Sequence, residues 1–171
     1  HRVRRDAVGR LAELAREGFA RLVTGAIASR EFWENFSKKS GLEVREDLLA
    51  RFFQPLPEPE VAELAQRLRR EVRVVVGTNT IESHYRIHLD RGDYEPFDAV
   101  YASHRLGVAK PDPAFYKYIL DHEGYTAGDS VFIDDLPANV QAAAALGIRA
   151  FHFNGAAELK KQIEELLSLT P

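Results

Sequence analysis

Two adjacent aspartates, Asp134 and Asp135, directly follow the apolar run VFI at residues 131–133. Neighbouring carboxylates repel each other unless a cation or hydrogen-bond donors offset their charge. Carboxylate oxygens are ligands that Mg²⁺ takes in proteins, usually together with water and phosphate oxygens. The pair therefore predicts a magnesium site at the end of a strand, with Asp135 and Asp134 as the metal residues.

Each aspartate also has an ordinary structural explanation. Asp135 could cap the helix that is expected to begin at Pro137, and Asp134 could be a solvated loop residue. Helix capping accounts for one carboxylate but not for a second one at the same strand end. Metal binding is therefore the favoured interpretation.

Further polar residues follow other apolar runs. Thr78 and Asn79 come directly after VRVVVG at residues 72–77, and Lys110 lies in the loop after a second run. A hydroxyl and backbone N–H groups at a strand-to-helix turn bind phosphate oxygens, and a lysine supplies a compact positive charge. Thr78 or Lys110 alone is a weak signal, but together with the aspartates they predict a small phosphorylated substrate bound with Mg²⁺.

The elements that position these residues alternate between strands and helices. Helices of about ten residues separate four expected strands, at residues 72–77, 98–103, 131–133 and 148–153. This alternation, with β-branched runs typical of buried parallel strands, predicts an α/β fold: a Rossmann-like parallel sheet with flanking helices. Right-handed crossovers place all strand-to-helix loops at one edge of such a sheet. The polar residues are therefore expected to meet there.

The chain before residue 58 has a different pattern. Leu11, Leu14, Phe19 and Leu22 recur at helical spacing, and a second helix, capped by Ser29, is expected to follow. The pattern predicts a small helical cap over residues 1–58 and an α/β core over residues 59–171. The second helix carries three aromatic residues that either form the core of the cap or line its substrate side: Phe32, Trp33 and Phe36.

Composition excludes several classes of function. Lys and Arg number 23 against 26 Asp and Glu, giving a net charge of −3, so there is no basic field to hold a nucleic acid. The chain has no cysteine, which excludes disulfides and thiolate metal sites. No apolar run approaches the ~20 residues of a membrane span. We therefore expect a cytoplasmic protein without nucleic-acid or membrane partners; the oligomeric state is not determined by the sequence.

Three stretches resemble known motifs: VVVGTNT, GVAKPDPAFYKYIL and VFIDDLPANVQAAAALGI, between residues 72 and 153. In order and spacing they resemble motifs two, three and four of the haloacid dehalogenase (HAD) superfamily. The resemblance is closest to small-cap phosphatases, including sugar-phosphate phosphatases and the N-terminal phosphatase domain of soluble epoxide hydrolases. The helical part before residue 58 is similar to most of their four-helix cap.

The resemblance implies a role for each site residue. Thr78 would bind the transferring phosphoryl group with Asn79 beside it, and Lys110 would neutralise the charge of nucleophile and phosphate. Asp135 would bind Mg²⁺ directly, and Asp134 would orient Lys110 or a metal-bound water. The implied activity is that of a Mg²⁺-dependent phosphatase that hydrolyses a small phosphorylated metabolite through an aspartyl-phosphate. The aspartate pair favours this over a metal-free 2-haloacid dehalogenase.

The first motif of the superfamily is absent. It is an Asp-x-Asp whose first aspartate is the nucleophile, and the 171 residues contain no such pattern. We expect it upstream of His1, on a central strand lying between the strands at 72–77 and 131–133, so these two strands are predicted not to pair directly. Residues 1–171 alone would then be inactive. The alternative is a non-catalytic HAD-like binding or scaffold protein.

One histidine lies close to these residues in the sequence. His104 precedes Lys110 in the loop after the strand at residues 98–103. It could reach the site, but a surface position is the favoured expectation.

Overall fold

The computed structural model describes residues 2–168, and side chains from residue 11 to residue 167. The chain divides into two compact units that alternate along the sequence. The first unit is His1–Leu56, Gly77–Tyr94 and Val100–Ala109; the second is Pro57–Val76, Glu95–Ala99 and Lys110–Pro171. The first unit thus combines the helices expected for residues 1–58 with two later segments.

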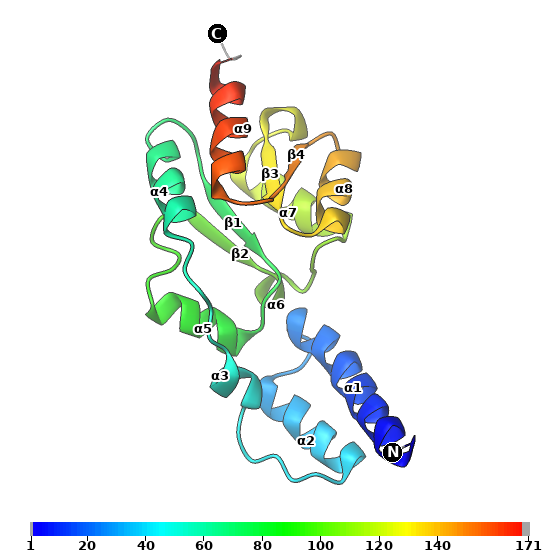
Figure 1. The fold of residues 1–171 in the computed structure, drawn as a ribbon. Helices are drawn as coiled ribbons and strands as arrows, with labels where there is room; N and C mark the ends of the chain where they lie inside the picture. The colour runs from blue at the N-terminus through cyan, green and yellow to red at the C-terminus, as the bar shows by residue number, and fades with distance from the viewer. Residues whose placement is uncertain (1, 169–171) are drawn as a thin grey trace. The chain divides into compact units, whose positions relative to one another are not determined.

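The first unit is helical. Its helices are α1 (Arg2–Val23), α2 (Ser29–Ser40), α3 (Leu48–Phe52), α5 (Glu82–Asp90) and α6 (Ser103–Leu106). Helices α1 and α2 lie side by side as a hairpin (Figure 1). The prediction that Ser29 caps α2 is wrong, because Ala28 holds the N-cap position and no side chain makes a capping hydrogen bond.

The core of the first unit packs the α1–α2 hairpin against Ile81, which lies in the loop after the strand expected at residues 72–77. Leu22, Ile27, Phe32 and Ile81 form a buried cluster. The partly buried side chains of Val23, Trp33 and Leu49 pack against it. Because Ile81 follows the polar residues Thr78 and Asn79 so closely, this core anchors the loop that carries them.

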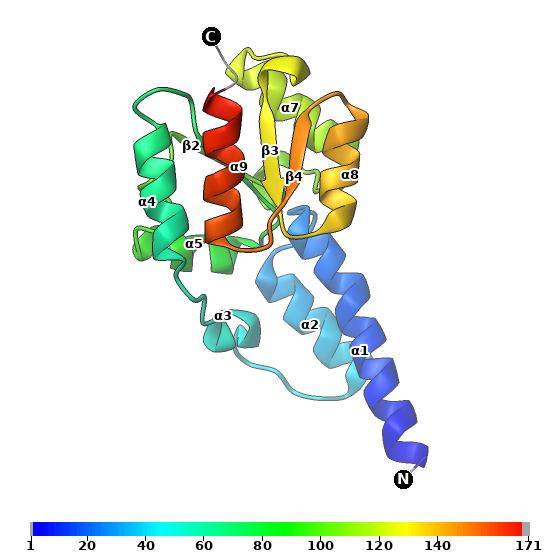
Figure 2. The same ribbon diagram turned by 45° about the horizontal axis from the view of Figure 1, so that its top comes forward.

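The second unit contains a parallel strand pair with helices around it. Its elements are α4 (Pro59–Leu68), α7 (Pro113–Glu123), a 3₁₀ turn (Ala127–Asp129), β3 (Val131–Asp134), α8 (Pro137–Ala145), β4 (Arg149–His152) and α9 (Ala156–Ser168). Strands β3 and β4 are parallel, with Val131 opposite Arg149 and Asp134 opposite His152. Helix α8 packs on both strands, and α9 lies beside α4 (Figure 2). The buried side chains of Leu64, Leu159 and Ile163 form the core here, with Ile133 and Phe153 against them.

The remaining strands form a second small sheet. β1 (Val75–Thr78) is hydrogen-bonded to β2 (Ala99–Ala102), whereas β3 is hydrogen-bonded to β4. Across residues 2–168 the strands therefore make two separate pairs, and β1 does not pair directly with β3, as predicted. The predicted α/β architecture of parallel strands and flanking helices is confirmed.

The first strand differs from its prediction in position and burial. It begins at Val75 rather than Val72, because the backbone N–H groups of Glu71 and Val72 both bond the carbonyl of Leu68 and prolong the end of α4. All four residues of β1 are half-buried, not fully buried as its composition suggested. Among residues 2–168, none of the helices combines the length and the apolar character that a membrane crossing requires.

Candidate active site

An ion pair between Lys110 and Asp134 is the centre of the site in the second unit. The Nζ of Lys110 lies 2.6 Å from Oδ2 of Asp134, and the side chains are 10% and 6% exposed. The ammonium also lies 5.6 Å from the centre of the Phe132 ring, on strand β3. A loop lysine is thus held against the carboxyl end of β3.

The second carboxylate oxygen of Asp134 is also engaged. Oδ1 accepts hydrogen bonds from the backbone N–H of Leu136 at 2.9 Å and from Nδ2 of Asn139 at 2.8 Å. Asn139 is itself held by its carbonyl, which accepts from the hydroxyl of Tyr116 at 2.9 Å. Since donors from the protein occupy both oxygens, the contacts favour a role for Asp134 in orienting Lys110 over direct metal coordination.

These contacts also set the protonation state of Asp134. Burial by itself would raise its pKa, but the hydrogen bonds from Lys110, Leu136 and Asn139 outweigh burial and leave the pKa of Asp134 below its ordinary value. Burial and the nearby charge of Asp134 raise the pKa of Tyr116 to about 12. Asp134 is therefore ionised and Tyr116 protonated at neutral pH.

Asp135 has a different environment. Its side chain is exposed, and across residues 11–167 its carboxylate makes no recorded hydrogen bond or ion pair; its backbone carbonyl accepts from Nε2 of His152 at 2.9 Å. The capping interpretation is wrong for this residue, because Leu136 is the N-cap of α8 and no side chain makes a capping hydrogen bond there. Asp135 thus offers an available carboxylate beside the ion pair.

This arrangement fits Mg²⁺ as one part of its coordination sphere. A hard cation takes oxygen ligands and completes its shell with water and phosphate oxygens, so a single available carboxylate is a reasonable protein ligand. Among the described side chains there is no group of three or more His, Cys, Asp or Glu that could hold a metal by themselves. The other ligands of the ion would have to come from water, from the substrate or from residues outside the described part of the chain.

The loop after β1 belongs to the first unit. Strand β1 ends at Thr78, and the backbone of Thr80 is held by a side chain that the sequence did not single out: the hydroxyl of Ser103 accepts from the Thr80 N–H at 3.0 Å and donates to its carbonyl at 3.2 Å. Ser103 is fully buried. Its position directly after the strand Ala99–Ala102 was the only sequence signal for this role.

His104 is not at the surface, contrary to expectation. Its side chain is 6% exposed, and Nε2 lies 2.7 Å from Oε2 of Glu82, at the start of α5. Burial by itself would raise the pKa of Glu82, but hydrogen bonds from His104 and Arg86 lower it below its ordinary value. The pair ties α6 to α5 inside the first unit.

The structure therefore brings together part of the predicted set. Lys110 and Asp134 are in direct contact, and Asp135 adjoins them in the second unit. Thr78 and Asn79 belong to the first unit. Their approach to Lys110 remains a prediction, as do the individual roles of all five residues.

Comparison with known proteins relates the chain to a family of hydrolases. The sequence profile of the haloacid dehalogenase-like hydrolases matches residues 3–147. A drimenol cyclase of Aspergillus calidoustus is 31% identical over 104 residues, which are 60% of this chain and 20% of that protein. A sesquiterpene phosphatase of Aspergillus oryzae is 25% identical over 162 residues, 84% of this chain and 83% of that protein. The chain thus spans only about a fifth of the cyclase.

A solved structure shows the same fold. It is that of an HAD family enzyme from Bacteroides thetaiotaomicron, crystallised with magnesium and inorganic phosphate. Its TM-score is 0.72 at 23% sequence identity, covering 81% of this chain and 75% of that one. The profile match over most of the chain, together with this fold, shows that the chain belongs to the haloacid dehalogenase-like hydrolase family.

Proposed function

We propose that the protein is a Mg²⁺-dependent phosphatase that hydrolyses a small phosphorylated metabolite. The observation that carries the proposal is the buried Lys110–Asp134 ion pair with the available carboxylate of Asp135 next to it. A fixed cation and a metal-binding carboxylate at one strand end suit a dianionic phosphate ester. The phosphatase relative and the neighbour crystallised with magnesium and phosphate support this chemistry.

In the proposed mechanism the residues of this chain bind and orient the phosphoryl group. Lys110, held by Asp134, neutralises charge on the phosphate and on the nucleophile, and Thr78 and Asn79 bind phosphoryl oxygens. Mg²⁺ on Asp135 would supply further positive charge to the phosphate oxygens. The buried hydrogen bonds of Asp134 keep the lysine in place without reorganisation during the reaction.

The covalent step needs a carboxylate nucleophile, and residues 1–171 contain no Asp-x-Asp motif to supply it. We propose that its oxygen attacks phosphorus and forms an aspartyl-phosphate as the P–O bond to the substrate breaks. The alcohol leaves with a proton from the second aspartate of the Asp-x-Asp motif. Water then cleaves this acyl phosphate, releasing inorganic phosphate and restoring the carboxylate. We expect this nucleophile in sequence upstream of His1.

The remaining assignments belong to the same proposal. Residues 1–58 would form the cap and residues 59–171 the core, in a cytoplasmic enzyme whose partner is its small substrate. The relative from Aspergillus oryzae is named a sesquiterpene phosphatase, so we include apolar alcohols among the candidate leaving groups.

The test is an assay of the complete gene product against phosphate monoesters, with and without Mg²⁺. Lys110→Met should lower kcat by about 100-fold or more, as expected when an electrostatic stabiliser of the transition state is removed. Lys117→Met, which removes an exposed lysine of α7, should retain activity. Halide release from 2-haloacids without phosphatase activity would indicate a dehalogenase, and ligand binding without turnover would indicate a binding protein.

A further inference from the structure

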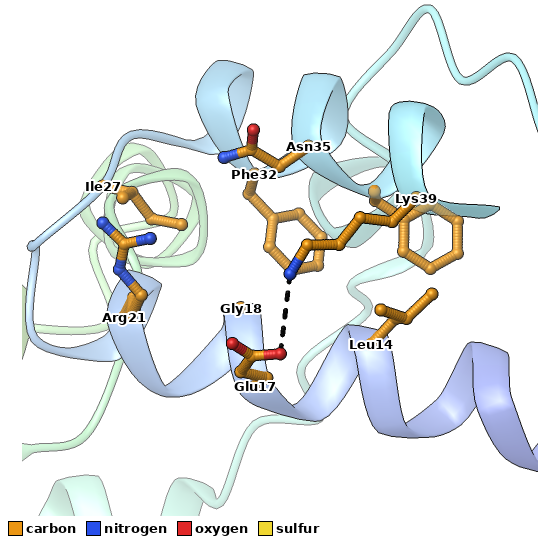
Figure 3. Close-up of a pocket in the computed structure, with 9 residues that line it drawn as sticks. Leu14, Glu17, Gly18, Arg21, Ile27, Phe32, Asn35 and Lys39 are labelled. Carbon is orange, nitrogen blue, oxygen red and sulfur yellow. Dashed lines mark ion pairs between the residues drawn. The ribbon is translucent and has the colours of Figure 1, made fainter. Parts of the chain in front are cut away.

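Two hollows of opposite character adjoin the α1–α2 hairpin. One has a volume of about 250 Å³ and a charged rim, where Lys39 and Glu17 lie 3.6 Å apart across the two helices (Figure 3). The other has a volume of about 410 Å³, and among the described side chains its lining is apolar except for Arg16; it includes Ala15, Phe19, Phe32, Trp33, Phe36 and Leu49. Only the second has the chemistry of a binding site for a hydrocarbon.

The aromatic rings that line the apolar cavity pack against one another and present little polarity. Phe32 and Trp33 meet edge to face with ring centres 4.8 Å apart, and Trp33 and Phe36 do so at 5.7 Å. The indole N–H of Trp33 donates to Oδ1 of Asp47 at 3.1 Å, so the polar end of this ring already has its partner. Polar groups of a ligand would find few partners along this wall, which disfavours a sugar because buried hydroxyls without hydrogen bonds are costly.

The cavity lies near the loop that we propose binds phosphate, and both belong to the first unit. Phe32 forms part of the cavity wall and packs in the same buried cluster as Ile81. Ile81 follows Thr78 by three residues, a length of chain that spans at most about 11 Å. Leu49, which also lines the cavity, accepts a hydrogen bond through its backbone carbonyl from Nε2 of His84 in α5 at 3.1 Å.

We propose that this cavity holds the apolar part of the substrate, and that the substrate is the monophosphate ester of a hydrocarbon alcohol of isoprenoid size. The volume falls within the range of about 300–1,000 Å³ that is typical of small-molecule sites. This inference rests on the proposed phosphatase function and adds the class of substrate to it. The phosphate lies at Thr78 and the hydrocarbon chain extends along the aromatic wall.

A binding experiment tests the cavity without requiring catalysis. Trp33 is the only tryptophan of residues 1–171 and lines the cavity, so its fluorescence reports on occupation directly. The complete gene product is titrated with farnesol, with glycerol as the polar comparison and Trp33→Phe to assign the signal. Farnesol should cause a saturable change in emission, and glycerol should cause none.

Two matched substitutions locate the binding. Phe19 and Phe52 are both exposed phenylalanines of the first unit, but only Phe19 lines the cavity. Phe19→Asp places a carboxylate against the hydrocarbon and should raise the Kd of farnesol at least about tenfold, whereas Phe52→Asp should leave it unchanged. Ala15→Leu, which fills the cavity instead of charging it, should also weaken binding. Equal effects of the Phe19 and Phe52 substitutions would overturn the proposal.

A kinetic series separates this inference from the proposed function. With dimethylallyl, geranyl and farnesyl monophosphates, kcat/KM should rise by about tenfold or more for each five-carbon unit, because each added methylene is buried, and should exceed that for glucose 6-phosphate. Phe19→Asp should reduce the ratio of farnesyl to dimethylallyl turnover. Mg²⁺-dependent turnover that favours sugar phosphates overturns the inference alone, while absence of any turnover overturns the phosphatase function.

Sedimentation tests whether a second copy of the chain covers the cavity instead. A dimer that dissociates on Phe19→Asp substitution would assign the cavity to a dimer interface and overturn the inference.

Discussion

Adjacent residues Asp134 and Asp135 have opposite surroundings: Asp134 is the last residue of β3, and Asp135 is the first residue after the strand. Asp134 is buried against Lys110 and Asn139, whereas Asp135 is exposed with its carboxylate available. The repulsion between neighbouring carboxylates is thus offset on one side by protein donors. We propose that a cation offsets the charge of Asp135. Substitution of each aspartate in turn tests this difference between the two residues.

Asp135→Asn should remove the response of the protein to Mg²⁺. For the wild type, stabilisation by Mg²⁺ should reach about 2.7 kcal/mol at a hundredfold excess over Kd. Without metal the variant should be as stable as the wild type or slightly more so, because the repulsion with Asp134 is relieved. Thermal melts with and without Mg²⁺ measure this, and Asp121→Asn, an exposed aspartate of α7, is the matched control. A wild-type metal shift in Asp135→Asn would show that Asp135 is not a ligand.

Asp134 should make stability depend on pH in the acid range. Its pKa is lowered in the folded state, so the unfolded chain binds more protons between the folded pKa and about 3.8. The stabilisation is therefore complete above about pH 5 and is lost as the pH falls through the folded pKa of Asp134. Urea unfolding at a series of pH values should show this loss in the wild type and a weaker one in Asp134→Asn. Identical pH slopes for the two proteins would contradict the assignment.

At the scale of elements, the turn between α1 and α2 is held by a close backbone contact. Gly25 has φ +68, and a Cβ built there would lie 2.0 Å from the carbonyl oxygen of His104. His104 is held in turn by Glu82, so this contact fixes the hairpin against α5 and α6 within the first unit. Gly41, at the end of α2, has φ +72 but no atom within 4 Å of the same position.

The two glycines form a matched pair for mutagenesis. Gly41→Ala should cost about 1–2 kcal/mol of unfolding free energy, the strain of a side chain in the left-handed region. Gly25→Ala should cost about 1–3 kcal/mol more, because the backbone of His104 must also move. Chemical denaturation of both variants measures the difference. Equal losses would mean that the turn can move away from His104 without cost.

At the scale of the whole molecule, the two strand pairs are the main feature. β1 pairs with β2 and β3 with β4, and the residues of β1 remain half-buried. Exposed strand edges attract other chains unless they are covered. We propose that a strand from outside residues 1–171, ending in the nucleophile, completes the core.

This proposal predicts a difference between residues 1–171 alone and the complete gene product. The shorter chain should show no phosphatase turnover, because it contains no Asp-x-Asp. It should also bind more of a hydrophobic dye such as ANS, because apolar faces of the strands and helices that the missing strand covers would be exposed. Turnover by residues 1–171 at the rate of the complete protein would place the nucleophile inside this chain.

Local sequence was sufficient to predict the α/β class and the alternating elements, and it singled out Lys110 and Asp134 as site residues; a contact between these two was implied only by the family resemblance. β-branched runs, helical spacing and the prolines at the first positions of α7 and α8 act over a few residues, so they can be recognised without knowledge of the fold. The family resemblance also predicted that the strand after residue 72 would not pair with the strand Val131–Asp134. Element ends were less predictable: the first strand starts later because a hydrogen-bonded turn up to Val72 follows the end of α4.

Only tertiary structure decided how the polar residues are used. The burial of Ser103 and His104 and the hydrogen bonds of Thr80 do not follow from residue spacing, and neither do the different surroundings of Asp134 and Asp135. Each depends on contacts with residues that are distant in the sequence. The cap aromatics show this most clearly. The sequence leaves two alternatives for Phe32, Trp33 and Phe36: the core of the cap or its substrate side. In the structure Phe32 is buried against Ile81 and also lines the apolar cavity.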